Sequence, residues 1–152
     1  MARVASERLP SVAGSGSAGR VVDEAVVAKV VVDEAVVAQL VADVGAEPAG
    51  EVCTIFLKDA CERVAVICGA LDAADGDAAR RAAHRLKSAA GFVGAVALAA
   101  RCTVLERLLA QGRLAEACSQ SGGLAADFKA TADEMGRVLA GLAPPRWSPA
   151  TP

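Results

Sequence analysis

Residues 82–94 bring together side chains that could accept and hold a phosphoryl group. They include His84, the single histidine of the chain, and Lys87, which follows one helical turn later. At about 100° of rotation per residue, a helix places both side chains on the face opposite its apolar residues. An exposed imidazole is a nucleophile, and a nearby ammonium group attracts an anion. His84 is therefore a candidate phosphate acceptor, with Lys87 as the residue that neutralises phosphate charge.

The apolar residues of this segment define the face that should be buried. A histidine of the core should share that face, and His84 does not, so we disfavour a buried structural histidine. An ordinary polar residue on a solvated helix face remains an open alternative. The residues expected on the buried face are Ala82, Ala83, Leu86, Ala89, Ala90 and Val93.

The neighbours of His84 fit an approaching partner. Arg80, Arg81 and Arg85 add positive charge that could attract an anionic group. Small residues beside the imidazole leave room for close approach. We expect docking or close approach to involve Arg80, Arg81, Ser88, Gly91 and Gly94.

The motif resembles the signature of the histidine phosphotransfer (HPt) domain family, which reads approximately His-x-Leu-Lys-Gly followed by Gly-Ala. Here it reads His84-Arg85-Leu86-Lys87-Ser88, followed by Gly94-Ala95. The resemblance runs from about residue 32 to about 142, and the next helix contributes Leu98, Cys102, Leu105 and Glu106. It implies that Nε2 of His84 is the acceptor. Ser88 replaces the usual glycine, and we expect slightly altered docking rather than lost phosphorylation.

The resemblance also implies partners and chemistry. A phosphocarrier of this family exchanges a phosphoryl group with response-regulator receiver domains, which hold the magnesium ion, so we expect no cofactor in this chain. A hybrid sensor histidine kinase, in cis or in trans, is a further expected partner. No nucleotide-binding glycine loop is present, which argues against a complete kinase. Two other classes stay open: a docking module that carries no phosphate, and a structural dimerisation bundle.

Composition predicts one helical domain within the 152 residues, flanked by other segments. Residues 1–20 are rich in Gly and Ser and indicate a flexible linker or tail. The segment 21–28 recurs as 31–38, so residues 21–30 are either an extra helix or a loosely packed duplication. Residues 31–142 form the predicted HPt-like domain, and residues 143–152 a disordered tail.

Apolar periodicity predicts an all-α fold, an antiparallel four-helix bundle with an additional N-terminal helix. Asp33 should cap the first helix and Gly45 should end it. A long helix should start near Pro48 and continue to about 74, and Gly76 should break the chain before the His84 helix. Gly94 should separate that helix from one at about 95–111. A last helix at about 113–142 should kink at Gly122-Gly123.

Several functional classes are disfavoured by composition. The formal net charge of −2 and the lack of aromatic residues among the arginines argue against nucleic-acid binding. The N-terminus lacks a secretory signal, and no run approaches the roughly 20 apolar residues of a membrane span, so we expect a cytoplasmic protein. Five scattered cysteines without a Cys-x-x-Cys pair argue against a zinc site and suggest reduced, buried thiols. A redox role for Cys61 and Cys68 is the alternative.

Overall fold

A computed structural model of the chain describes residues 30–142, and it is all-helical over this range. The first three helices are α3 (Glu34–Val44), α4 (Ala46–Asp72) and α5 (Gly76–Val93). They are followed by α6 (Val96–Ala110), the short α7 (Leu114–Cys118) and α8 (Ser121–Leu142). The predicted linker, the first copy of the repeat and the C-terminal tail lie outside the described residues.

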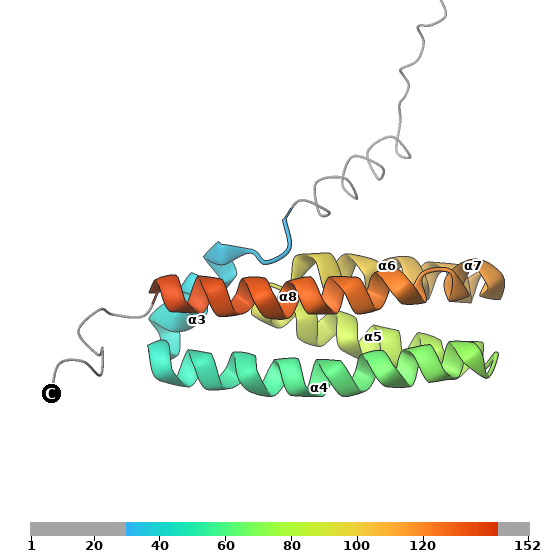
Figure 1. Cartoon of the computed structure of the whole chain (residues 1–152), viewed down its shortest axis with the longest axis horizontal. Helices are drawn as coiled ribbons and strands as arrows, with labels where there is room; N and C mark the ends of the chain where they lie inside the picture. Colours follow the sequence, from blue (N-terminus) through green and yellow to red (C-terminus); the bar gives the residue numbers. More distant parts are fainter. Residues whose placement is uncertain (1–29, 143–152) are drawn as a thin grey trace, which may run out of the picture. The chain divides into compact units, whose positions relative to one another are not determined.

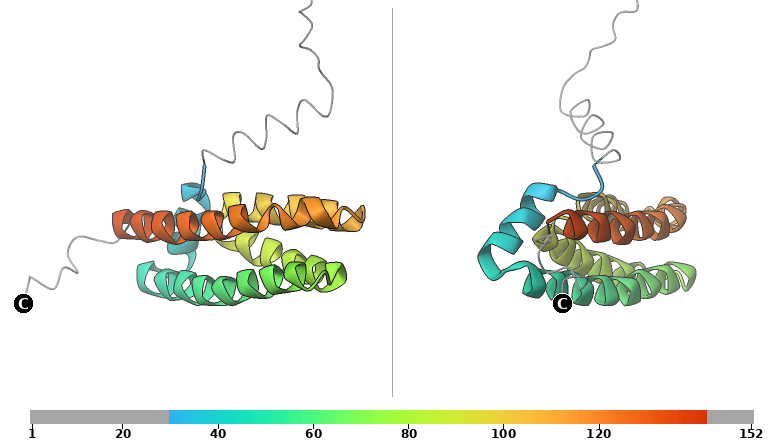
Figure 2. Two further views of the ribbon diagram at one scale, coloured as in Figure 1. Left: turned by 45° about the vertical axis from the view of Figure 1, so that its right-hand side comes forward. Right: turned by 60° about the vertical axis from the view of Figure 1, so that its left-hand side comes forward.

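Four long helices, α4, α5, α6 and α8, form the predicted antiparallel bundle (Figure 1). Helix α5 packs mainly against α4 and α6, and α8 packs against the same two helices, so α5 and α8 lie at opposite corners. Helix α3 crosses one end of the bundle and contacts α4, α8 and α5 (Figure 2). Among the described residues, no helix is both long enough and apolar enough to cross a membrane.

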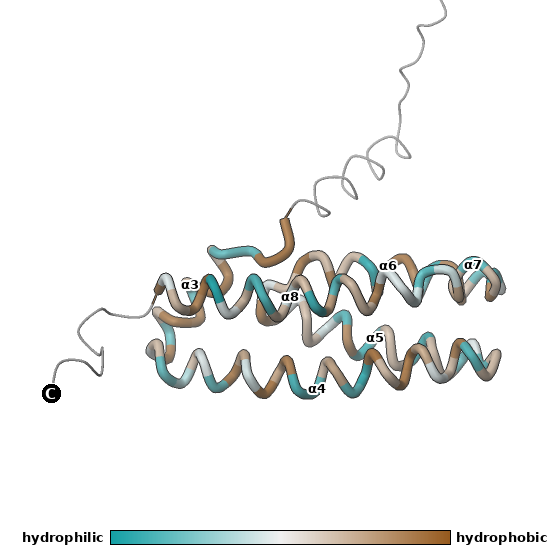
Figure 3. The backbone as a smooth tube through the Cα atoms, viewed as in Figure 1, coloured by the Kyte–Doolittle hydropathy of each residue, from teal (hydrophilic) through white to brown (hydrophobic). Residues whose placement is uncertain are grey.

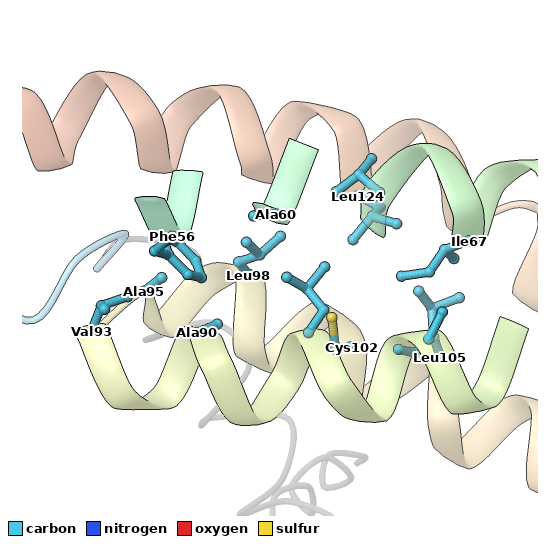
Figure 4. Close-up of a cluster of buried hydrophobic side chains, with 14 of the residues drawn as sticks. Phe56, Ala60, Ile67, Ala90, Val93, Ala95, Leu98, Cys102, Leu105 and Leu124 are labelled. Carbon is cyan, nitrogen blue, oxygen red and sulfur yellow. The ribbon is translucent and has the colours of Figure 1, made fainter. Parts of the chain in front are cut away.

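The core is built from the apolar faces of these helices, while polar residues alternate with them along each helix (Figure 3). Much of the buried face of α5 is alanine, which lets neighbouring backbones approach closely. Larger side chains from the other helices fill the interior, and Figure 4 shows part of this cluster. The large, fully buried residues include Ile67, Leu86, Leu98, Leu105, Leu124 and Met135. This packing fixes the rotation of α5 and hence the direction of its outer face.

Helix α3 contains the second copy of the repeat and has the predicted caps. The side chain of Asp33 accepts a hydrogen bond from the backbone N–H of Ala35 at 3.0 Å, and Gly45 ends the helix. The backbone N–H of Asp33 donates to the carbonyl of Gly94 at 2.8 Å, and Ala97 donates to Val31 at 3.3 Å. These bonds join the start of α3 to the turn after the His84 helix.

Two predicted chain breaks are displaced. Gly76 was expected to interrupt the chain, but it is the first residue of α5, capped by Asp75. The turn lies just before it, at residues 73–75, where Ala74 has a positive φ of 59°.

The expected kink at Gly122-Gly123 is also wrong in position. The interruption lies at Ser119 and Gln120, and both glycines belong to the start of α8. A Cβ atom on Gly123 would lie 2.6 Å from Cζ of Arg101, whose Nε donates to Asp127 at 2.8 Å. Gly123 therefore leaves space for an arginine from α6, a tertiary requirement that helix propensity alone does not show.

Candidate functional site

Helix α5 presents His84 to solvent, as predicted. The side chain of Asp75 accepts a hydrogen bond from the backbone N–H of Ala78 at 3.1 Å and starts the helix. Leu86, Ala90 and Val93 are buried and anchor the opposite face. The side chain of His84 is 62% exposed. The alternative of a buried core histidine is therefore excluded by the structure.

Glu106 on α6 joins His84 to Lys87. Its Oε2 lies 2.7 Å from Nδ1 of His84, and its Oε1 lies 2.5 Å from Nζ of Lys87. The carboxylate side chain is only 18% exposed. A single acidic group from the neighbouring helix thus contacts both residues that the motif identified.

This contact determines which nitrogen of His84 is free. An ionised carboxylate is only an acceptor, so the Nδ1 atom facing it must carry the proton and donate. In the neutral imidazole, Nε2 then retains its lone pair. On this exposed ring Nε2 is the unprotonated nitrogen, and it is the atom that the family resemblance implies as the acceptor.

The same contacts keep Glu106 ionised. Burial alone would raise the pKa of this carboxyl, but the bonds from Lys87 and His84 outweigh burial and lower its pKa below the ordinary value. Because Glu106 stays charged, it can hold the proton on Nδ1 of His84 at the pH values at which proteins normally function.

Three arginines of α5 extend the positive charge around His84. Arg80, Arg81 and Arg85 are all exposed, and none has an ion-pair partner within residues 30–142. Their guanidinium groups are available to an acidic surface or an incoming phosphoryl group. Within the described part of the chain, the helix that bears the candidate nucleophile therefore carries positive charge that forms no ion pair.

The small residues of the motif separate into two groups. Ser88 and Gly91 are exposed, and a Cβ atom on Gly91 would meet nothing within 4 Å. Both therefore lie on open surface of α5. Gly94 is instead buried beside the start of α3 and offers no open surface of its own.

Gly94 is required by the fold. It ends α5 with a φ of +81°, and a Cβ atom there would lie 2.9 Å from Cβ of Val36 and 3.1 Å from the carbonyl oxygen of Asp33. Only glycine fits this left-handed conformation beneath α3 without strain.

Sequence reasoning included Glu106 in the resemblance but did not give it a role. A signal was available, because α5 and α6 are antiparallel and their turn is centred near Gly94 and Ala95. Residues at similar distances on either side of such a turn lie at the same level, as His84 and Glu106 do. Reading the hairpin across its turn would have placed this carboxylate opposite the histidine.

Among the cysteines of the described residues, Cys102 lies near enough to the site for the charges of Glu106 and Lys87 to act on its thiol. Cys53 and Cys102 are buried, and burial raises the pKa of both thiols, that of Cys102 to about 12. Cys61 is exposed, so the expectation that the thiols are all buried is wrong for this residue.

No group of three or more His, Cys, Asp or Glu side chains within residues 30–142 could hold a metal ion.

Comparisons with known proteins agree with this geometry. The model of the Hpt domain family matches residues 51–140, more than half of the chain. The solved structure of histidine-containing phosphotransfer protein B (HptB) from Pseudomonas aeruginosa PAO1 is similar, with a TM-score of 0.68 and 26% sequence identity. The alignment covers 74% of this chain and 97% of that protein. No curated protein matches the chain significantly. The chain belongs to the family of Hpt domains.

Proposed function

We propose that this chain accepts a phosphoryl group on Nε2 of His84 from a receiver-domain aspartate and passes it to another receiver. The observation that carries this proposal is the 2.7 Å contact between Nδ1 of His84 and Glu106. This contact keeps the proton of the imidazole on Nδ1, so that Nε2 retains the lone pair that attacks phosphorus. The family membership supports the same role in a phosphorelay.

The transfer is a direct displacement at phosphorus. The lone pair of Nε2 attacks the phosphorus of the aspartyl phosphate, the bond to the aspartate oxygen breaks, and the aspartate leaves as a carboxylate. The ring then carries a positive charge and keeps its proton on Nδ1, where Glu106 stabilises it. The return step reverses these bonds. No proton has to leave the site in either direction.

The residues around His84 have separate roles in this proposal. Lys87, held by Glu106, supplies an ammonium group that offsets phosphate charge, while Arg80 and Arg81 attract the acidic receiver. Ser88 and Gly91 leave space for its active site. The magnesium ion would belong to the receiver, the exchange would take place in the cytoplasm, and a hybrid sensor kinase would supply such a receiver in cis or in trans.

Phosphorus NMR tests the proposal directly. The purified chain is incubated with a receiver domain phosphorylated by acetyl phosphate, in parallel with the His84→Gln variant. We expect a base-stable, acid-labile phosphohistidine resonance in the native chain and none in the variant.

If the native chain and the His84→Gln variant both bind the receiver and neither forms phosphohistidine, the result would instead support the docking module. That module predicts retained signalling in the His84→Gln variant. The phosphocarrier predicts that signalling is lost while binding is retained.

A further inference from the structure

The last turn of α5 carries an exposed aromatic side chain that the proposed transfer does not explain. Phe92 is 67% exposed, and it is the only large exposed apolar residue on the helix that bears His84. The other members of this class within residues 30–142 precede α3 or lie on α3, α4 and α8: Val30, Val44, Ile55, Val66 and Leu142. A single exposed apolar residue needs no explanation by itself, so its position relative to His84 decides the argument.

Phe92 lies on the same side of α5 as His84. Eight residues of a helix advance about 12 Å and rotate about 80° in net terms, so the two side chains share one broad face. Ser88 lies between them, and Gly91 has open space where a Cβ atom would stand. No bulky side chain of α5 separates the imidazole from the aromatic ring.

An interface of ordinary size centred near His84 is wide enough to include Phe92. A standard protein interface buries about 800 Å² on each partner, which corresponds to a disc of roughly 16 Å radius. Phosphoryl transfer places Nε2 of His84 within that disc. Side chains on an α-helix generally point back towards its N-terminus, which for Phe92 is the direction of His84.

Charged and apolar side chains are distributed unevenly along the outer face of α5. Arg80, Arg81 and Arg85 lie in the first half of the helix or beside His84, are exposed, and have no ion-pair partner within the described part of the chain. Phe92 lies at the other end. The outer face of α5 therefore carries exposed arginines up to residue 85 and an exposed aromatic ring at residue 92, which is complementary to an acidic surface adjoining an apolar one.

We propose that Phe92 is a specificity-determining residue that binds an apolar depression on the receiver domain, while the arginines face its acidic side. This inference rests on the proposed phosphotransfer function and adds the orientation and selection of the partner. Aromatic side chains that become fully desolvated dominate the affinity of many interfaces, whereas exposed charges chiefly affect association rate. Receivers that present a polar group at the matching position should be poor substrates.

The test measures transfer from a panel of receiver domains phosphorylated with acetyl phosphate. The receiver that phosphorylates the native chain fastest is then used with Phe92→Ala and Phe92→Leu. We expect Phe92→Ala to raise the half-saturating receiver concentration at least tenfold and to leave the single-turnover rate at saturation unchanged. Phe92→Leu should recover most of the loss. As a control, Val44→Ala removes an exposed apolar side chain from α3, away from the motif. It should change neither the half-saturating concentration nor the rate at saturation.

Charge substitutions supply an independent readout. Replacing Arg80, Arg81 and Arg85 by glutamine should lower the association rate and weaken its dependence on salt, while Phe92→Ala should raise the dissociation rate at any salt concentration. Far-UV circular dichroism checks that each variant keeps its helices.

The two proposals fail in different ways. If the native chain is phosphorylated and Phe92→Ala has the native half-saturating concentration, the role of Phe92 is refuted and phosphotransfer stands. A loss confined to the saturating rate would also refute it. If no receiver phosphorylates the native chain, the proposed function fails, and the inference that rests on it fails with it.

Discussion

At the scale of single residues, the site depends on one carboxylate shared between two bases. Oε2 of Glu106 faces Nδ1 of His84 and Oε1 faces Nζ of Lys87. The histidine by itself, on an exposed helix face, has neither a fixed tautomer nor a fixed ring orientation. Glu106 supplies both, in the way that a second group orients a catalytic histidine elsewhere. We therefore treat it as a positioning residue.

Removing the carboxylate of Glu106 should alter the tautomer of His84 while the helical fold is kept. We expect Glu106→Ala to lower the population of neutral His84 with the proton on Nδ1 and to slow phosphorylation about tenfold, since loss of such an orienting partner commonly costs 10- to 100-fold. Glu106→Gln keeps an oxygen that can accept from Nδ1 and should retain more activity. Nitrogen-15 NMR of the imidazole reports the tautomer. An unchanged tautomer combined with slow transfer would contradict this role.

The lowered pKa of Glu106 links this residue to acid stability. A carboxyl whose pKa is lower in the folded than in the unfolded state stabilises the fold above its unfolded pKa, ordinarily 4.5 for Glu. That contribution is lost as the pH falls through the folded value. The free energy of unfolding of the native chain should therefore decline more steeply than that of Glu106→Gln as the pH falls below this ordinary value.

Urea unfolding at a series of pH values measures the difference between the two proteins. The difference should be constant near neutral pH and should shrink in acid. If it has the same size throughout the acid range, the ion pair with Lys87 makes no contribution to stability.

At the scale of the helices, sequence reasoning succeeded where the signal was local. Asp33 and Gly45 delimit α3 because capping is a matter of a few neighbouring residues, and the spacing of Leu86 and Val93 gave the buried face of α5. It failed for Gly123 and for the role of Glu106. Both depend on a neighbouring helix: Arg101 occupies the space above Gly123, and Glu106 reaches across to α5.

Gly94 and Gly91 should respond to substitution by alanine in opposite ways, because Gly94 has a left-handed backbone and Gly91 lies on open helix surface. Gly94→Ala should destabilise the fold by at least about 1–2 kcal/mol, because its φ of +81° is unfavourable for alanine and the added Cβ would meet Val36. Gly91→Ala, in the interior of α5 with open space around it, should stabilise the fold by up to about 1 kcal/mol. Chemical denaturation compares the two. Equal effects of the same sign would refute this distinction.

At the scale of the whole molecule, residues from Val31 onwards form a compact unit that contains the entire described core. The second copy of the repeat belongs to this unit as α3, where it meets the turn at Gly94. The site likewise draws all its contacts from α5 and α6. The core described within residues 30–142 and the contacts of His84 there include no residue of the first copy.

A fragment beginning at Val31 should therefore keep both stability and chemistry. We expect its melting temperature to differ from that of the full chain by less than about 4 °C, which corresponds to under about 1 kcal/mol for a domain of this size. Phosphorylation of His84 by the same receiver should proceed at the native rate, and size-exclusion chromatography should show an unchanged number of subunits. A dimeric full chain with a monomeric, less stable fragment would instead assign residues 21–28 to dimerisation. The structural bundle requires that result, whereas a phosphocarrier whose site lies wholly on α5 and α6 does not.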